Sequence, residues 1–542
     1  MPEIRDNETL SFGDALFLYL EREGAPLNVA SICIFEGAIS IENFTDFVES
    51  KLPLIPRYRQ RVVTPPFNIG IPTWQYDPEF DVRNHVRQIS LKRGTESELK
   101  DVAARLLSAT MNRERPLWDL TLVSGLKGNR TAVVARVHHC LVDGIAGVAL
   151  MNVIMDPSPE IPVLPKKKRS FEPPPARDAG TVLLDGFITS MFSAVQRVLT
   201  AQAEVLSVAQ RVAAAAGRQS ESSSPEGSNG SAQNGQVPAI ADLVNLLPEF
   251  LAPTARLPFN VVCRGPQRFS WAEIPLEEIK AVKNACGVTV NDVVLAVMTT
   301  AIGKYVELHG VKTEGRLLRI VVPVNVRGKD STGELGNRIT FAPVTVPMGV
   351  HEPLQLVASV RERTAFVKSA HLAELVGLAG TLLTTVPTPV QAFAGPIASQ
   401  LPISVCNTIC TNVPGPTVPL YVLGHKMLSW YPYVPIGGEM GMNCAVLTYD
   451  GKMFFGFTGD VQAVPDLDRL AKSVGISFAE LRKAAGVRTR RRSPRKTTTA
   501  VKPEKTTAAT DFVATPHIPA KHEPAEHAGE PSHKTMRTAV GQ

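Results

Sequence analysis

The chain has 542 residues, enough for two or three domains that each bury a core. Its net charge of +6 equals that of residues 488–542, which hold eleven basic and five acidic side chains, so residues 1–487 are neutral overall. This balance argues against a folded body that binds nucleic acid through charge. The seven cysteines show neither disulfide-framework nor zinc-site spacing, so we expect a reducing cytosol and no metal.

Residues 1–164 form the first expected unit. The segment 44–52 is helix-like and the segments 29–37 and 131–137 are strand-like, but helices and strands do not alternate strictly. This order favours a mixed sheet covered by helices over a doubly wound parallel sheet. The first twelve residues include acidic side chains where a signal peptide needs a basic region and an apolar core, so we do not expect export.

The run HHCLVDG, residues 138–144, joins a strand-like segment to a helix-like segment that begins at Ile145. A neutral imidazole at a strand end can take a proton from an alcohol or thiol near pH 7. Asp143 would hold the ring in one tautomer or brace the loop, and Gly144 allows a tight turn. Two packed histidines are the structural alternative. The adjacent pair, with Asp and Gly at this spacing, favours a catalytic site.

Residues 165–240 are expected to link the two units. They begin with clustered prolines and four consecutive basic residues at 166–169. A long helix is predicted for 181–217, and a flexible low-complexity stretch for 218–235. This helix would either pack across the domain junction or rest on a membrane surface or acyl channel.

Residues 241–487 form the second expected unit, built from ingredients similar to those of the first. Its predicted elements are strands at 318–326 and 339–347, a hairpin with Asp450-Gly451 at its turn, and helices at 276–285, 292–307 and 467–486. Within this unit, residues 375–424 contain no Asp, Glu, Lys or Arg, but seven prolines argue against a membrane span. We expect this segment to be core or the lining of an apolar channel.

The tail, residues 488–542, has few apolar side chains and is expected to be disordered. Its basic beginning is suited to anionic lipid headgroups.

The sequence lacks the G-x-S-x-G, Walker and G-x-G-x-x-G motifs, which argues against an α/β-hydrolase, nucleotide hydrolysis and nicotinamide chemistry. Cys140 is expected to pack rather than act as a nucleophile. Direct transfer remains, in which a base removes the proton of an acceptor hydroxyl as its oxygen attacks a thioester.

The motif HHxxxDG at 138–144 is that of acyltransferases with a chloramphenicol-acetyltransferase-like fold. Further blocks resemble the bacterial wax ester synthase/diacylglycerol acyltransferase family. These blocks lie at 12–21, 54–62, 80–86, 116–126, 290–298, 322–328 with 336–338, and 411–416. Together, in this order, they are specific for the family. The resemblance implies a two-lobed α/β fold with mixed (α+β) sheets, whereas residues 165–240 and 488–542 depart from the family pattern.

The resemblance also assigns roles to individual residues. It makes His139 the general base, while His138 and Gly144 shape the pocket. Asp143 would stabilise the loop by pairing with an arginine, for which we name Arg59 first and Arg61 second. Five more residues match family motifs whose role near the site is structural: Pro116, Leu117, Trp118, Asn291 and Asp292. Asn291-Asp292 fits a helix N-cap equally well.

The activity implied is esterification of diacylglycerol, and of long-chain alcohols, to triacylglycerol or wax ester. Acyl-CoA would be the co-substrate, without a bound cofactor or metal. We expect a cytoplasmic protein that associates peripherally with the inner face of the membrane or with lipid droplets and binds no nucleic acid. Two alternatives stay open: an acyltransferase that uses a carrier-tethered substrate, and a catalytically silent lipid-surface protein.

Overall fold

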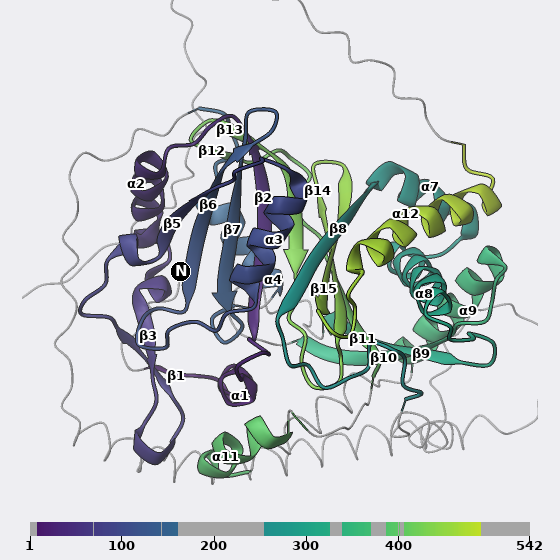
Figure 1. The fold of residues 1–542 in the computed structure, drawn as a ribbon, viewed down its shortest axis with the longest axis horizontal. Coiled ribbons are helices and arrows are strands. Elements are labelled where there is room, and N and C mark those ends of the chain that lie inside the picture. Colours follow the sequence, from purple (N-terminus) through teal and green to yellow (C-terminus); the bar gives the residue numbers. More distant parts are fainter. Residues whose placement is uncertain are drawn as a thin grey trace, which may run out of the picture. The chain divides into compact units, whose positions relative to one another are not determined.

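The computed structural model contains two six-stranded sheets with helices packed against them (Figure 1). The described residues are 8–68, 70–142, 144–160, 254–325, 339–369, 386–398, 400 and 406–488. The predicted linker at 165–240 and the predicted tail beyond Arg488 lie outside them. So does Asp143 of the histidine motif.

The first sheet has the strand order β12–β13–β2–β7–β6–β5. Its neighbours run antiparallel except β5 and β6, which are parallel, so the sheet is mixed as predicted. Four consecutive residues of β2, from Ile32 to Phe35, are buried, because both faces of this strand are covered. The strands span Tyr421–Val422 (β12), His425–Tyr433 (β13), Asn28–Glu36 (β2), Arg130–His138 (β7), Trp118–Leu126 (β6) and Val86–Ser90 (β5).

The second sheet has the order β10–β9–β11–β14–β15–β8 and is also mixed. Strand β11 runs parallel to β9 and β14, and the other neighbours are antiparallel. The strands span Ile339–Pro347 (β10), Leu317–Asn325 (β9), Thr408–Val413 (β11), Met442–Tyr449 (β14), Lys452–Asp460 (β15) and Gln267–Pro275 (β8). A small third sheet contains Glu8–Thr9 (β1), Thr73–Tyr76 (β4) and Gln60–Val63 (β3).

The predicted hairpin at Asp450-Gly451 is confirmed. Strands β14 and β15 pair up to Tyr449 and Lys452, so the loop has two residues. Both loop residues have positive φ, 41° at Asp450 and 77° at Gly451. Turns of this kind match the twist of the paired strands, which explains why Asp-Gly between two apolar runs predicted the hairpin.

Helices cover each large sheet. Helices α2, α3 and α4 pack into the core around the first sheet, and α7, α8, α9 and α12 into the core around the second. The helices span Phe12–Leu20 (α1), Ile41–Lys51 (α2), Glu96–Leu107 (α3), Gly144–Ile154 (α4), Leu276–Cys286 (α7), Val290–Leu308 (α8), Pro353–Ser369 (α9), Thr388–Ala398 (α11) and Leu467–Ala484 (α12). Short 3-10 helices span Leu52–Leu54 (η1), Pro56–Arg59 (η2), Pro66–Asn68 (η3) and Val82–Asn84 (η4).

None of these helices, taken singly, has the length and apolar character to cross a membrane. Helices α7 and α8 pass that test only as a pair, by length and composition, and they meet at a bend of 99°.

Strands β12 and β13 were not expected in the first sheet. They follow β11 of the second sheet in sequence, yet β13 pairs with β2, with Met427 opposite Phe35 and Tyr433 opposite Ala30. The core of the first sheet accordingly includes Trp271 and Phe454 from strands of the second sheet. A linear division into residues 1–164 and 241–487 therefore does not describe which strands share a sheet.

The described part of the charge-free segment 375–424 is only partly buried. Its strand β11 lies within the second sheet, as expected for core. Helix α11, in contrast, exposes Val390, Phe393 and Ile397. The expectation of core is wrong for this side of the helix, because an apolar composition does not reveal which faces have a packing partner; the alternative, the lining of an apolar channel, stays a prediction.

Candidate active site

The histidine pair lies where β7 ends, between its two neighbouring strands. Asn28 of β2 is the last residue paired across from His138. The backbone N–H of His138 donates to the carbonyl of Leu117 (2.9 Å), and that of His139 donates to the carbonyl of Leu27 (2.9 Å). The backbone of His138 is thus bonded to the residue before β6 and that of His139 to the residue before β2. A fixed backbone is expected where the side chains must keep one position.

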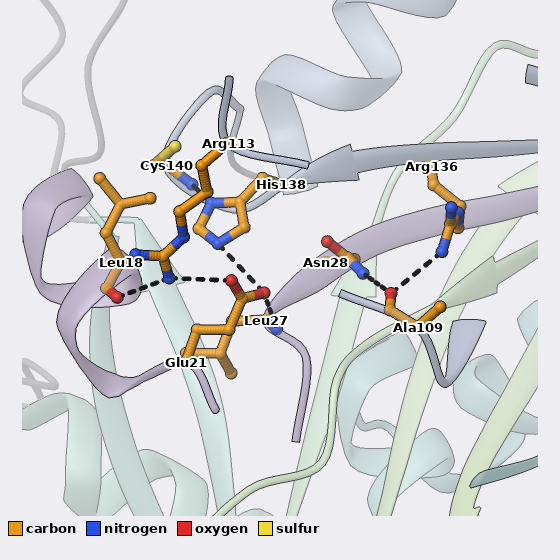
Figure 2. Close-up of polar contacts among 9 residues, drawn as sticks. All are labelled: Leu18, Glu21, Leu27, Asn28, Ala109, Arg113, Arg136, His138 and Cys140. Carbon is orange, nitrogen blue, oxygen red and sulfur yellow. Dashed lines mark hydrogen bonds and ion pairs between the residues drawn. The ribbon is translucent and has the colours of Figure 1, made fainter. Parts of the chain in front are cut away.

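His138 is fully buried, and both of its ring nitrogens face polar groups (Figure 2). The backbone N–H of Cys140 donates to Nδ1 (3.1 Å), which assigns the ring proton to Nε2. Nε2 lies 3.4 Å from Oε1 of Glu21. With Nδ1 accepting and Nε2–H directed at a carboxylate, His138 has no ring nitrogen left to take a proton from a substrate.

Glu21 is a buried carboxylate that the sequence reasoning missed. It accepts hydrogen bonds from the backbone N–H of Leu27 (3.1 Å) and from Nη2 of Arg113 (2.9 Å), in addition to its contact with His138. Burial acts to raise the pKa of Glu21, but the interactions with His138, Arg113 and Leu27 outweigh burial and lower it to about 2. Glu21 is therefore ionised at neutral pH and fixes the tautomer of His138.

A second polar cluster joins the strands next to His138 (Figure 2). Nδ2 of the buried Asn28 and Nη1 of Arg136 both donate to the carbonyl of Ala109, at 3.2 and 3.1 Å. Arg136 also binds both carboxylate oxygens of the buried Asp119. These bonds tie β2, β6 and β7 together beside His138, so the scaffold of the site is stiff.

The ring of His139 packs against an aromatic side chain. The ring stacks on Phe17 of α1, with centroids 3.9 Å apart and an interplanar angle of 11°. Within the described residues, Nδ1 is buried without a hydrogen bond. Burial lowers the pKa of His139 to about 4; a backbone hydrogen bond at His139 opposes this shift, and His138 adds a smaller lowering. The imidazole is thus uncharged at neutral pH and available to accept a proton.

The lowered pKa of His139 predicts an unusual pH profile. The base stays deprotonated down to about pH 4. We therefore expect kcat/KM to keep its neutral-pH value well below pH 6.5, which is the ordinary pKa of histidine. Stability should fall over the same interval as the pH drops, because the unfolded chain binds a proton that the folded chain excludes. Rates measured across this range, with recovery checked after return to neutral pH, test this. A reversible acidic limb centred at 6.5 would contradict it.

The predicted partner of Asp143 stays a prediction, because Asp143 lies outside the described residues. Arg59 ends η2, and its guanidinium lies 6.0 Å from the ring centre of Phe80. Burial lowers the pKa of Arg59. Arg61 donates to the carbonyl of Glu114 (3.4 Å). Gly144 is the first residue of α4.

Pro116, Leu117 and Trp118 are buried where β6 begins, next to the end of β7. Leu117 contacts the site directly through the bond from the backbone N–H of His138. The indole of Trp118 donates to the carbonyl of Tyr58 (2.7 Å) and stacks on His85 at 4.4 Å. These three residues therefore pack beneath the histidine pair and offer it no reactive group.

Cys140 follows the pair but is not a candidate nucleophile. Its side chain is buried, and burial raises the pKa of the thiol well above its usual value, so it stays protonated. All seven cysteines of the chain are free thiols.

Asn291 and Asp292 lie in the first turn of α8, whose N-cap is Thr289. Asp292 is buried and accepts from the backbone N–H and hydroxyl of Thr289 (2.8 Å each) and from the hydroxyl of Thr364 (2.7 Å). The N-cap interpretation was right in kind, but the cap is Thr289 and Asp292 completes a capping box.

We expect Asp292→Ala to reduce the free energy of unfolding by about 1–3 kcal/mol, because it leaves buried donors of Thr289 and Thr364 unpaired. Thr289→Ala should cost about 1 kcal/mol. Neither change should alter kcat per folded molecule. Thermal unfolding and kcat, with Asn291→Ala as control, test this, and a loss of kcat at unchanged Tm would show that Asp292 belongs to the chemistry.

The chain matches two family models. The model of the wax ester synthase/diacylglycerol acyltransferase catalytic domain matches residues 10–294, and that of the WS/DGAT C-terminal domain matches residues 335–482. The chain belongs to the wax ester synthase/diacylglycerol acyltransferase family. The matched regions contain both the histidine pair and the capping box of α8.

Relatives within the family are distant. The probable diacylglycerol O-acyltransferase tgs1 of Mycobacterium tuberculosis is 28% identical over 457 residues, covering 84% of this chain and 91% of the relative. The probable diacylglycerol O-acyltransferase tgs2 of the same organism is 27% identical over 488 residues, covering 88% and 98%. The sequence therefore resembles these acyltransferases over most of its length.

Solved structures share the two-lobed fold. The wax ester synthase/diacylglycerol acyltransferase from Marinobacter aquaeolei VT8 superposes with a TM-score of 0.60 at 22% identity, covering 89% of this chain and all of that chain. The first condensation domain of the calcium-dependent antibiotic synthetase gives 0.54 at 15% identity, covering 88% and 96%. At these identities the likeness concerns the fold alone.

Proposed function

We propose that the protein transfers the acyl group of acyl-CoA to the hydroxyl of diacylglycerol, and to long-chain alcohols, with His139 as the general base. The observation that carries this proposal is the neutral imidazole of His139, which has a pKa of about 4 and is held by stacking on Phe17. Its family, and relatives named as probable diacylglycerol O-acyltransferases, support the substrate class.

The proposed reaction needs one base and no covalent enzyme intermediate. As the acceptor oxygen attacks the thioester carbonyl, its proton passes to His139. The tetrahedral intermediate then collapses, the carbon–sulfur bond breaks, and the imidazolium returns the proton to the CoA thiolate. The products are an ester and free CoA. The ring of Phe17 would favour the transient imidazolium, because an aromatic face attracts a cation.

The surroundings of His138 support the proposal that His139, and not His138, is the base. His138 has both nitrogens directed at protein groups, one of them the carboxylate of Glu21. We propose that His138 shapes the pocket and fixes the loop that carries His139. Asp143, paired with Arg59, is proposed to brace the same loop.

The experiment is turnover by the purified full-length chain with labelled palmitoyl-CoA. Diacylglycerol and hexadecanol are offered separately, and the products are resolved by chromatography. We expect labelled triacylglycerol and CoA release in equal amounts, both dependent on His139. If turnover occurs only with a carrier-bound acyl group, the donor is a carrier-tethered acyl group and the proposal of acyl-CoA is wrong. Absence of turnover with every donor would leave a lipid-surface protein without catalysis.

A further inference from the structure

Helix α11 presents an apolar face to solvent. Val390, Phe393 and Ile397 follow one another at helical spacing and lie on one side of the helix. All three are exposed, Phe393 by 77%. No ionic side chain occurs between residues 375 and 424. This side of α11 therefore offers hydrocarbon without charge.

Phe67 belongs to η3, which lies beside the start of α11. It is 86% exposed, more than any other large apolar side chain in the described residues. The hydroxyl of Thr388, at the start of α11, donates to the carbonyl of Asn68 (3.0 Å) and accepts from the N–H of Gly70 (3.3 Å). Phe67 has a φ of 56°, which bulky residues rarely adopt. We call Phe67, Val390, Phe393 and Ile397 the apolar face.

The opposite side of α11 packs on α1 (Figure 1). Gly395 permits this contact, because a Cβ there would lie 2.8 Å from the carbonyl oxygen of Tyr19. Helix α1 also carries Phe17, which stacks on His139. A single helix therefore connects the apolar face to the proposed base.

We infer that the apolar face rests on a phospholipid bilayer that contains diacylglycerol; this inference rests on the proposed function. The helix that carries this face packs on α1, which contributes Phe17 to the site, and the proposed acceptor resides in such a bilayer. Its lack of charge matches the hydrocarbon region, whereas a protein interface is rimmed by polar groups. Helix α11 has 11 residues, too few to span a membrane but suited to lie in its surface.

A tryptophan at position 393 would report insertion directly. The four native tryptophans are all buried, so Phe393→Trp would add the one exposed indole among the described positions. With uncharged vesicles of phosphatidylcholine and diacylglycerol, we expect its emission to shift to the blue and to be quenched by brominated acyl chains. Ile476→Trp, at an exposed apolar position of α12, is the matched control and should not respond.

Charge on the apolar face should abolish the contact. Phe393→Glu and Phe67→Glu should each weaken vesicle binding about tenfold or more, because a buried aromatic side chain supplies this much of the partition. Ile476→Glu should bind like the unmodified chain. The Phe variants should also lose turnover on vesicle-embedded diacylglycerol while keeping turnover on a soluble alcohol, which shows that they fold.

Unquenched emission at position 393, or unchanged vesicle binding of both Glu variants, would overturn the inference. A dimer that dissociates on Phe393→Glu without any effect on vesicle binding would overturn it in favour of a second copy on this face. Binding and quenching need no turnover, so they can succeed when esterification fails. Conversely, His139-dependent esterification without quenching would reject only the lipid contact.

Discussion

Replacing His139 by alanine should lower kcat/KM roughly 10²–10⁴-fold, the usual contribution of a positioned general base. Nδ1 of the ring has no hydrogen-bond partner among the described residues, so its removal takes no partner from another buried group. The free energy of unfolding should therefore change much less than the activity. Steady-state kinetics with acyl-CoA and diacylglycerol, alongside thermal unfolding, measure both quantities.

Two other histidines provide the comparison. His138→Ala removes a partner of Glu21, so we expect lower stability and a smaller loss of kcat than at His139. His351→Ala, at an exposed position, should leave both unchanged. Full activity of His139→Ala, or a greater loss of kcat at His138 than at His139 in folded protein, would reverse the roles proposed for the pair.

Replacing Glu21 by alanine should reduce the free energy of unfolding by about 3–5 kcal/mol, as for a broken buried ion pair. The change leaves the N–H of Leu27 and Nε2 of His138 without their acceptor. It also frees His138 to change tautomer, so kcat should fall as well. Glu21→Gln, which keeps the shape and one acceptor oxygen, should restore part of both.

The pH dependence separates the charge of Glu21 from its shape. Because its pKa is about 2 in the folded chain and 4.5 ordinarily, the unfolded chain binds the proton first as the pH falls. Ionised Glu21 therefore contributes on the order of 3 kcal/mol above pH 4.5, and this is lost as the pH falls towards 2. Glu21→Gln should lack this component.

Glu439→Gln is the matched control, because Glu439 is equally buried and pairs with the half-exposed Arg256 at 2.8 Å. It should lose stability without loss of kcat. Equal losses of kcat in the two Gln variants would mean that Glu21 is merely structural.

Local patterns were predictable where neighbours in sequence decide the structure. The strand that ends in the histidine pair, and the hairpin at Asp450-Gly451, depend on residues a few positions apart. Glu21 was hidden because its contacts are with Arg113 and His138, far along the chain. For the same reason the pairing of β13 with β2 could not be read from either strand. Helix α11 shows the converse: its composition predicted core or the lining of an apolar channel, and its exposed side chains rule out core on one side.

The place of β13 bears on how this protein is made. Tyr433 pairs with Ala30, so one edge of β2 has no partner until some four hundred residues later are synthesised. At about 5–20 residues per second, that interval lasts roughly 20–80 s. The nascent N-terminal lobe carries an open strand edge throughout, which invites pairing with other chains. A fragment ending at residue 294, where the catalytic-domain match stops, would keep that edge permanently. The sheet that holds the histidine pair is therefore complete only once β13 has joined it.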